Sequence, residues 1–165
     1  MTTDVFTEAG MLLVDTPLPD IHGLLPHRYP FLLVDRITAL EPGRRAEGVK
    51  RVSEAEWCVD AAGPRTGMPG GLIVEALAQL SAAVLLGLVD AGSGVVGYFL
   101  GLDRVRYRGV AQAGDELLLR AELVRARRGL CRTRGEAWVA GGRRLVRAEL
   151  TIVLRTESQS IAQVT

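Results

Sequence analysis

Residues 68–79 read Met-Pro-Gly-Gly-Leu-Ile-Val-Glu-Ala-Leu-Ala-Gln, the start of a predicted helix that carries one carboxylate in an apolar run. From residue 72 to residue 89 the only ionisable side chain is Glu75, and Gln79 follows one turn later on the same face. Burying an unpaired carboxylate is costly or forces it to keep its proton. Glu75 is therefore either a proton donor in an apolar cavity or a partly exposed side chain near a helix start, where the macrodipole favours negative charge.

The helix that begins in this stretch is apolar on all sides, so it needs cover on more than one side. The run over residues 72–89 reaches about the minimum length for crossing a bilayer. However, Glu75, Gln79, Ser81 and Gly87 interrupt the run, and no basic residues flank it. We expect a buried central helix and no membrane insertion.

The segments around the helix have the patterns of strands. Ala140-Gly-Gly142 has the composition of a hairpin turn between the last two of them. We expect a first strand entered through residues 31–34 and further strands over 46–52, 95–107, 116–124, 130–139 and 143–154. One long apolar helix followed by an antiparallel meander predicts an α+β fold, an antiparallel sheet wrapped around the helix, with a second copy covering what remains.

Three regions divide the chain by composition. Residues 1–19 are predicted to form an N-terminal arm, residues 20–155 the domain and residues 156–165 a mobile polar tail. A short helix or turn is expected around residues 21–25, and a loop rich in Ala, Gly and Pro over residues 53–70.

Charge and cysteine content exclude several classes of protein. A chain of 165 residues has the length of one domain, and its net charge of +1 argues against nucleic-acid binding. Cys58 and Cys131 lie far apart without histidines at ligand spacing, which indicates a reduced, metal-free, cytoplasmic protein. Residues 104–147 hold 12 arginines against four acidic residues, a tilt that suits an acidic partner or simply reflects the exposed faces of strands.

Two long stretches carry a family resemblance. Residues 25–36 read Leu-Pro-His-Arg-Tyr-Pro-Phe-Leu-Leu-Val-Asp-Arg, and residues 69–79 begin with Pro-Gly-Gly and end with Ala-Leu-Ala-Gln. Together with shorter pieces at 98–103, 114–115 and 127–130, they resemble the hotdog-fold 3-hydroxyacyl-acyl carrier protein dehydratases of fatty-acid and polyketide synthesis. The resemblance covers about residues 24–154 and implies a hotdog fold, a dimer and dehydratase chemistry.

In that family a histidine of one subunit and a glutamate of the other meet in a tunnel at the dimer interface. The histidine removes the α-proton of a 3-hydroxyacyl thioester, while the glutamate helps the 3-hydroxyl leave as water. Amides at the helix start polarise the thioester carbonyl. Glu75 matches the family's acid. The positions that match its substrate-binding segments are Gly70, Gly71, Gln79, Tyr98 and Phe99.

This chain departs from the family at the base. The family histidine lies in a Gly-His-Phe-Pro-Gly loop, and the matching position is Ala61, 14 residues before Glu75. The segment Val59-Asp-Ala-Ala-Gly-Pro64 contains no histidine. The chain's two histidines are His22 and His27, and His27 resembles a structural and site-lining element of the family instead of its base.

Three functions stay open. We favour a half-site enzyme, in which Glu75 pairs with the histidine of a related partner subunit and the chain alone is inactive or nearly so. A non-catalytic scaffold or acyl-chain-binding subunit would use Glu75 only as a helix-start residue. A homodimer with altered chemistry would use Asp60 as a substitute base, which requires burial to make it more basic, or Glu75 to activate water for thioester hydrolysis.

The resemblance also implies an acyl carrier protein as partner, bringing the substrate on a phosphopantetheine arm, with no other cofactor. Such carriers are acidic, so arginines near a tunnel mouth would steer them. Arg104, Arg106 and Arg108 follow the Gly-Leu-Asp segment and are the expected carrier-binding residues. The second subunit is expected to be a histidine-bearing hotdog protein or another copy of this chain.

Overall fold

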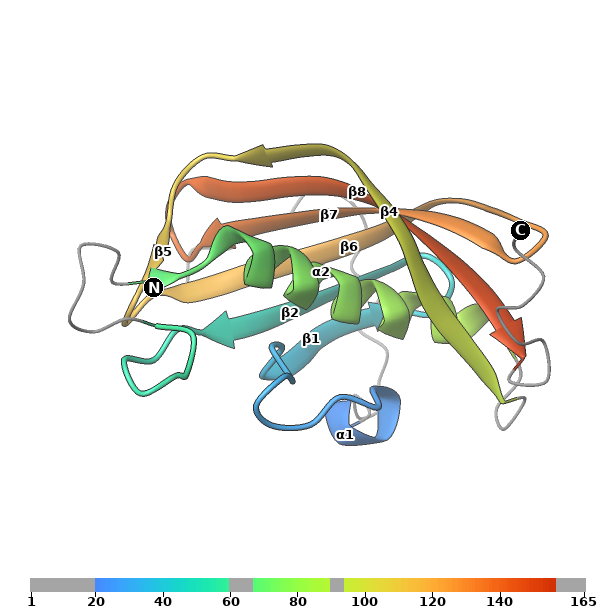
Figure 1. Ribbon diagram of the computed structural model, residues 1–165, viewed down its shortest axis with the longest axis horizontal. Helices are drawn as coiled ribbons and strands as arrows, with labels where there is room; N and C mark the ends of the chain where they lie inside the picture. Colours follow the sequence, from blue (N-terminus) through green and yellow to red (C-terminus); the bar gives the residue numbers. More distant parts are fainter. Residues whose placement is uncertain (1–19, 60–66, 90–93, 157–165) are drawn as a thin grey trace.

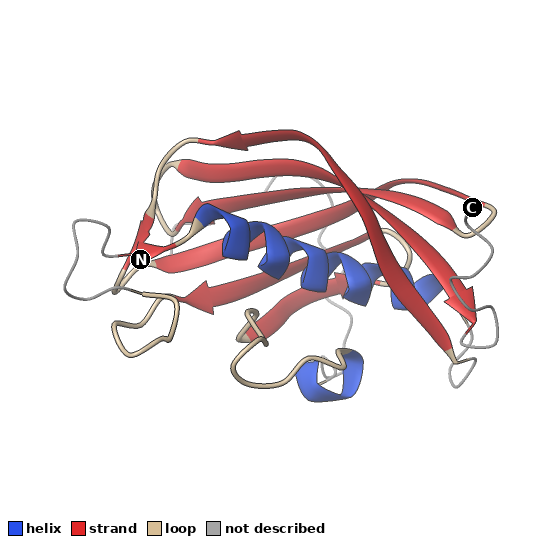
Figure 2. Cartoon of the chain, in the orientation of Figure 1, coloured by secondary structure: helices blue, strands red, loops and turns tan. Residues whose placement is uncertain are grey.

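One long helix, α2 (Gly70–Leu85), lies along the concave side of a curved antiparallel sheet (Figure 1). The computed structural model describes residues 20–59, 67–89 and 94–156. Figure 2 shows the sheet bending around the helix, with the small helix α1 (Ile21–Leu24) on the open side. The predicted α+β hotdog fold is confirmed.

The main sheet has six strands in the order β1-β2-β6-β7-β8-β4, and every neighbouring pair is antiparallel. In chain order these strands are β1 (Arg36–Glu41), β2 (Arg45–Arg51), β4 (Val95–Tyr107), β6 (Glu116–Arg127), β7 (Leu130–Val139) and β8 (Arg144–Thr156). Hairpins join β6, β7 and β8, so the middle of the sheet is a meander. The two edges are β1 and β4.

Alternation along the strands builds the core. Leu117 and Leu119 of β6 point inward and are buried, whereas Leu118 between them is partly exposed. They belong to one hydrophobic core with Ile73, Leu77 and Leu80 of α2.

The first strand starts later than expected. β1 begins at Arg36, whereas residues 31–34 were predicted to enter it. The reason is a side-chain acceptor on α2: the backbone N–H of Leu33 donates to Oε1 of Gln79 at 2.9 Å, so it does not pair with a strand. The ladder contact begins at Asp35, whose N–H donates to the Val49 carbonyl at 2.9 Å.

Short elements complete the described part of the fold. A 3₁₀ turn, η1 (Leu86–Leu88), continues α2. A pair of two-residue strands, β3 (Gly67–Met68) and β5 (Ala111–Gln112), was not expected, because two residues cannot show an alternating pattern.

The helical stretch Gly70–Leu88 is long and apolar enough to cross a membrane by length and composition alone. More than half of it is buried inside the fold. This burial agrees with the predicted core helix.

A row of small residues seats α2 on the sheet. Ala46, Ala121, Gly135 and Ala148 are register neighbours across four strands, and the three alanines are fully buried. A Cβ atom added to Gly135 would lie 2.9 Å from Cβ of Leu77 and 3.1 Å from its Cδ1. The helix therefore sits too close to β7 for any side chain at position 135.

Replacing this glycine should unseat the helix. We predict that Gly135→Val lowers the free energy of unfolding by about 1–3 kcal/mol, because the added atoms overpack against Leu77. Urea denaturation measures the change. Gly101→Ala on β4 is the matched control, since its new Cβ would meet nothing within 4 Å and should cost less than about 0.5 kcal/mol. Equal losses in both variants would contradict the close seating.

Candidate active site

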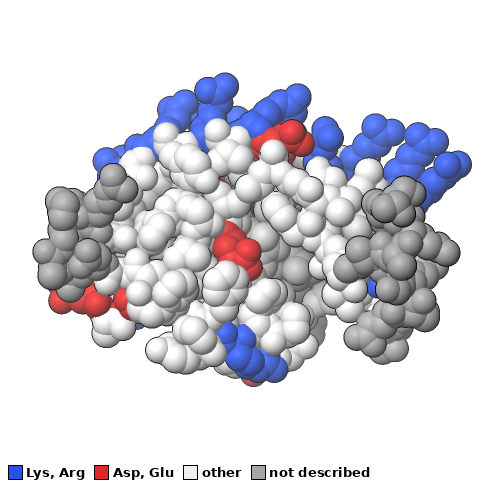
Figure 3. All heavy atoms as spheres, in the orientation of Figure 1, with Lys and Arg blue, Asp and Glu red and all other residues white. Residues whose placement is uncertain are grey.

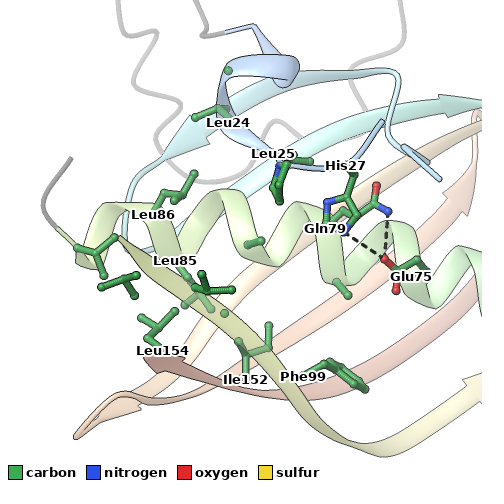
Figure 4. Close-up of a pocket in the computed structure, with 18 of the residues that line it drawn as sticks. Leu24, Leu25, His27, Glu75, Gln79, Leu85, Leu86, Phe99, Ile152 and Leu154 are labelled. Atoms are coloured by element: carbon green, nitrogen blue, oxygen red, sulfur yellow. Dashed lines mark hydrogen bonds and ion pairs between the residues drawn. The ribbon is translucent and has the colours of Figure 1, made fainter. Parts of the chain in front are cut away.

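A pocket of about 530 Å³ lies between α2, the segment 22–28 and the first part of β4 (Figure 4). Most of its lining is apolar, from Leu24, Leu25, Leu85, Leu86, Phe99, Ile152 and Leu154. The polar side chains at its wall include Glu75, Gln79 and His27. Such a cavity, apolar with a few convergent polar groups, is typical of a small-molecule site.

Glu75 stands alone as an acid on the wall of this pocket. It is the one carboxylate of α2, and its side chain is 31% exposed. Figure 3 shows the face of the molecule over α2 as mostly uncharged, with an acidic side chain near its centre. Glu75 thus lines an apolar pocket, as the first reading of the sequence expects, and is partly exposed, as the second expects.

Gln79 holds Glu75 and joins α2 to the segment before β1. Its Nε2 donates to Oε1 of Glu75 at 3.1 Å and to the Phe31 carbonyl at 2.8 Å. Its Oε1 accepts the Leu33 N–H at 2.9 Å, which fixes the orientation of the amide. Because both amide hydrogens are used, Gln79 fixes Oε1 of Glu75, and no described residue donates to Oε2.

His27 faces the same carboxylate. Its Nε2 lies 3.8 Å from Oε1 of Glu75, and the ring is 31% exposed. Figure 4 shows both side chains and Gln79 meeting at one point of the pocket wall. The family resemblance predicts His27 as a site-lining residue, and in the structure His27 lines the pocket.

The start of the loop that lacks the histidine is tied to the Pro-Phe segment. Trp57 donates from Nε1 to the Pro30 carbonyl at 2.9 Å, and its ring stacks on Phe31 with centroids 6.4 Å apart.

Lys50 is held by two carboxylates, one of them in the same loop. Burial lowers the pKa of Lys50, but its hydrogen bonds and ion pairs with Glu56 and Asp35 outweigh this effect and raise the pKa overall. These contacts fix the chain up to residue 59.

The structure does not describe the two loop positions on which the sequence prediction depends. Asp60, the suggested substitute base, and Ala61, the position of the missing histidine, lie outside the described residues. Within the described ranges no group of three or more His, Cys, Asp or Glu could hold a metal ion.

The glycines at the start of α2 have different surroundings. Gly70 lies against the ring of Tyr107, so that an added Cβ would come within 2.6 Å of it. Gly71 faces open space. The first N–H groups of α2 have no side-chain cap, which leaves donors available for an oxygen of a ligand. Neither glycine lines the pocket.

Tyr98 and Phe99 point to opposite sides of β4. Phe99 pairs in register with Ile152, and both line the pocket. Tyr98 pairs with Val153 and is not part of the lining. Strand alternation therefore turns Phe99, and not Tyr98, toward the pocket.

The three expected carrier-binding arginines lie at the far end of β4 from the pocket. Arg104 donates to Oε2 of Glu149 at 2.7 Å, and this hydrogen bond lowers the pKa of that carboxyl although burial opposes it. Arg106 and Arg108 are exposed. Figure 3 shows basic side chains gathered along the upper edge of the molecule in this view. Arg106 and Arg108 are better placed for a partner than Arg104, which is already paired.

Sequence reasoning missed how the acid is held. Gln79 was assigned to substrate binding, whereas its three hydrogen bonds are made to the protein. A polar side chain in an apolar helix, one turn after an acid, was the available signal. Its donor partner Leu33 and its acceptor partner Phe31 lie 46 and 48 residues away, which helical spacing cannot reveal.

The comparisons with known proteins identify the family of the chain. The chain matches the FabA-like domain family over residues 25–149. It is 45% identical over 141 residues to the 3-hydroxyacyl-[acyl-carrier-protein] dehydratase FabZ of Syntrophotalea carbinolica, covering 85% of this chain and 95% of that protein. It is 43% identical over 135 residues to FabZ of Bacillus subtilis, covering 81% and 94%.

Solved structures show the same fold at low identity. A chain of the dehydratase heterocomplex ApeI:P from Xenorhabdus doucetiae is similar with a TM-score of 0.72 at 18% identity, covering 88% of this chain and 97% of that one. A hypothetical thioesterase with coenzyme A from Streptococcus pneumoniae has a TM-score of 0.60 at 19% identity, covering 73% and 85%. The fold is that of a hotdog protein. The chain belongs to the FabA-like domain family, and the relatives named above are FabZ dehydratases.

Removing the amide of Gln79 should loosen the pocket wall. We predict that Gln79→Met lowers the free energy of unfolding by about 2–4 kcal/mol, since the Leu33 N–H and the Phe31 carbonyl lose their partner. Urea denaturation measures this, with Gln112→Met at an exposed position as the matched control. Similar stability of the two variants would show that the Gln79 bonds do not hold the segment.

Proposed function

We propose that the chain is a subunit of a 3-hydroxyacyl-acyl carrier protein dehydratase that supplies the acid to a composite site. Glu75 gives its proton to the substrate, and the base is a histidine of the partner subunit. The observation that carries this proposal is Oε1 of Glu75 bonded to Gln79 at 3.1 Å in an apolar pocket, in a chain that lacks the family's loop histidine. The acid half is intact, whereas the base half is missing.

The chemistry balances with one acid and one base. The partner subunit's histidine takes the α-proton, and the electron pair of that C–H bond becomes the C2–C3 double bond. The C3–O bond breaks as Glu75 transfers a proton to the leaving hydroxyl, which departs as water. Since Oε1 is bonded to Gln79, Oε2 is the oxygen available for this transfer. The N–H groups at the start of α2 are suited to polarise the thioester carbonyl.

A second subunit has a natural place to dock. β4 is an edge strand of 13 residues with unpaired backbone groups along one side of the described sheet. Its exposed apolar side chains include Phe99 at 50%, Leu100 at 58% and Tyr107 at 55%. A related subunit pairing along β4 would cover them and bring its loop near the pocket. The heterocomplex ApeI:P is a precedent for a dehydratase built from two different chains.

The substrate would arrive on an acyl carrier protein in the cytoplasm. The phosphopantetheine arm of the carrier is then the prosthetic group of the substrate, and the proposal needs no resident cofactor. Exposed Arg106 and Arg108 would steer an acidic carrier, and the apolar pocket would take its acyl chain. A non-catalytic acyl-binding subunit and a thioesterase homodimer are the competing functions.

Complementation tests the composite site. We predict that this chain restores turnover when coexpressed with a family member that keeps its Gly-His-Phe-Pro-Gly loop but has its own acid changed to glutamine. Each protein alone should be nearly inactive, because one lacks the base and the other the acid. Mass spectrometry of a 3-hydroxyacyl-acyl carrier protein follows the loss of water, and native mass spectrometry verifies the mixed dimer.

The matched control is Glu75→Gln in the same pair. It should lower turnover about 100-fold or more without changing the amount of mixed dimer. Turnover that survives Glu75→Gln would favour the non-catalytic subunit. Release of free acid would instead favour thioester hydrolysis, and Asp60→Asn would then separate an Asp60-dependent reaction from one that depends on Glu75.

A further inference from the structure

His27 is the ionisable side chain next to Glu75, and the proposed reaction gives it no task. Its Nε2 lies 3.8 Å from Oε1 of Glu75, the same oxygen that accepts from Gln79. Its Nδ1 is buried and has no hydrogen-bond partner among the described residues. The two ring nitrogens therefore face very different surroundings.

The backbone around His27 is held firmly. The guanidinium of Arg28 donates to the carbonyl of His27 at 2.7 Å, to that of Leu25 at 2.8 Å and to that of His22 at 3.1 Å. These three bonds hold residues 22–28 together at the pocket. They fix the backbone position from which the His27 side chain extends. The other titratable side chains on the lining are His22, Arg28 and Glu75 itself.

The surroundings choose the tautomer of the neutral ring. A proton on Nδ1 would be a buried N–H without an acceptor among the described residues, which is rare and unfavourable in folded proteins. A proton on Nε2 points an N–H at the Glu75 carboxylate instead. The favoured neutral form thus has its proton on Nε2 and a bare lone pair on Nδ1.

This tautomer does not suit a base. The nitrogen that faces the pocket already carries the proton, so it cannot accept the α-proton of a substrate. An imidazolium would also place an N–H at Nδ1, where no described residue accepts it. His27 is therefore a poor replacement for the missing loop histidine and a good donor.

We infer that His27 is a positioning residue for Glu75, donating from Nε2 to Oε1 when Glu75 has given up its proton. At 3.8 Å the contact is longer than a hydrogen bond, and catalytic hydrogen bonds often shorten only when substrate is bound. With Gln79 and His27 both directed at Oε1, Oε2 alone delivers the proton. The role of His27 in proton transfer to the substrate rests on the proposed function. The tautomer of its imidazole ring does not.

The ring can be observed directly because the chain has two histidines. Long-range proton–nitrogen NMR correlation on the untagged chain, labelled with ¹⁵N-histidine, reports the tautomer of each ring. The expected result is a neutral His27 with its proton on Nε2, and an Nε2 resonance that shifts in Glu75→Gln while His22 is unchanged. His22→Gln assigns the two signals. A neutral His27 with its proton on Nδ1 would overturn the inference, whether or not the chain turns over substrate.

Turnover of the mixed dimer gives the second readout. His27→Leu should lower kcat about tenfold with KM unchanged, and His27→Gln should recover most of the loss through its amide N–H. In the Glu75→Gln background His27→Leu should have no further effect. A loss as large as that of Glu75→Gln itself, not rescued by glutamine, would make His27 the base and overturn the positioning role.

Discussion

The hydrogen-bonded amide of Gln79 is the constraint on which the site depends. Three bonds from one side chain join the central helix, the segment before β1 and the carboxylate of Glu75. The amide is 2% exposed, so each of these bonds forms out of water and an unmade one would be costly. The bond to Leu33 also delays the start of β1, so residues 31–34 form an irregular segment between the pocket-lining residues 22–28 and the strand.

In the proposed half-site enzyme, the same arrangement provides one half of a catalytic pair. Glu75, Gln79 and His27 all belong to this subunit and meet at Oε1, so the acid is built and oriented without a partner. A base has no such support here, because the sequence carries no histidine in the loop before α2. The long open edge of β4 is where another subunit can supply one. In the proposed composite site, the acid half and the base half are separate parts that join only on assembly.

Much of the fold could be predicted from the sequence, since it follows from local patterns. The apolar run after Pro69 predicted the buried helix, and alternation predicted the strands after residue 95. The site was predictable only as far as resemblance reached, which identified Glu75 and the loop without a histidine. The partners of Gln79 and the approach of His27 depend on contacts between segments almost 50 residues apart. The small-residue row under α2 likewise becomes visible only when four strands are in register.

The most direct test of the half-site is turnover by the purified chain alone. A 3-hydroxyacyl-acyl carrier protein is incubated with it, and mass spectrometry of the carrier registers both loss of water and release of free acid. If Glu75 is an acid that waits for the base of a partner subunit, the carrier should stay unchanged. Dehydration by the chain alone would contradict this, because a base would then exist within the chain.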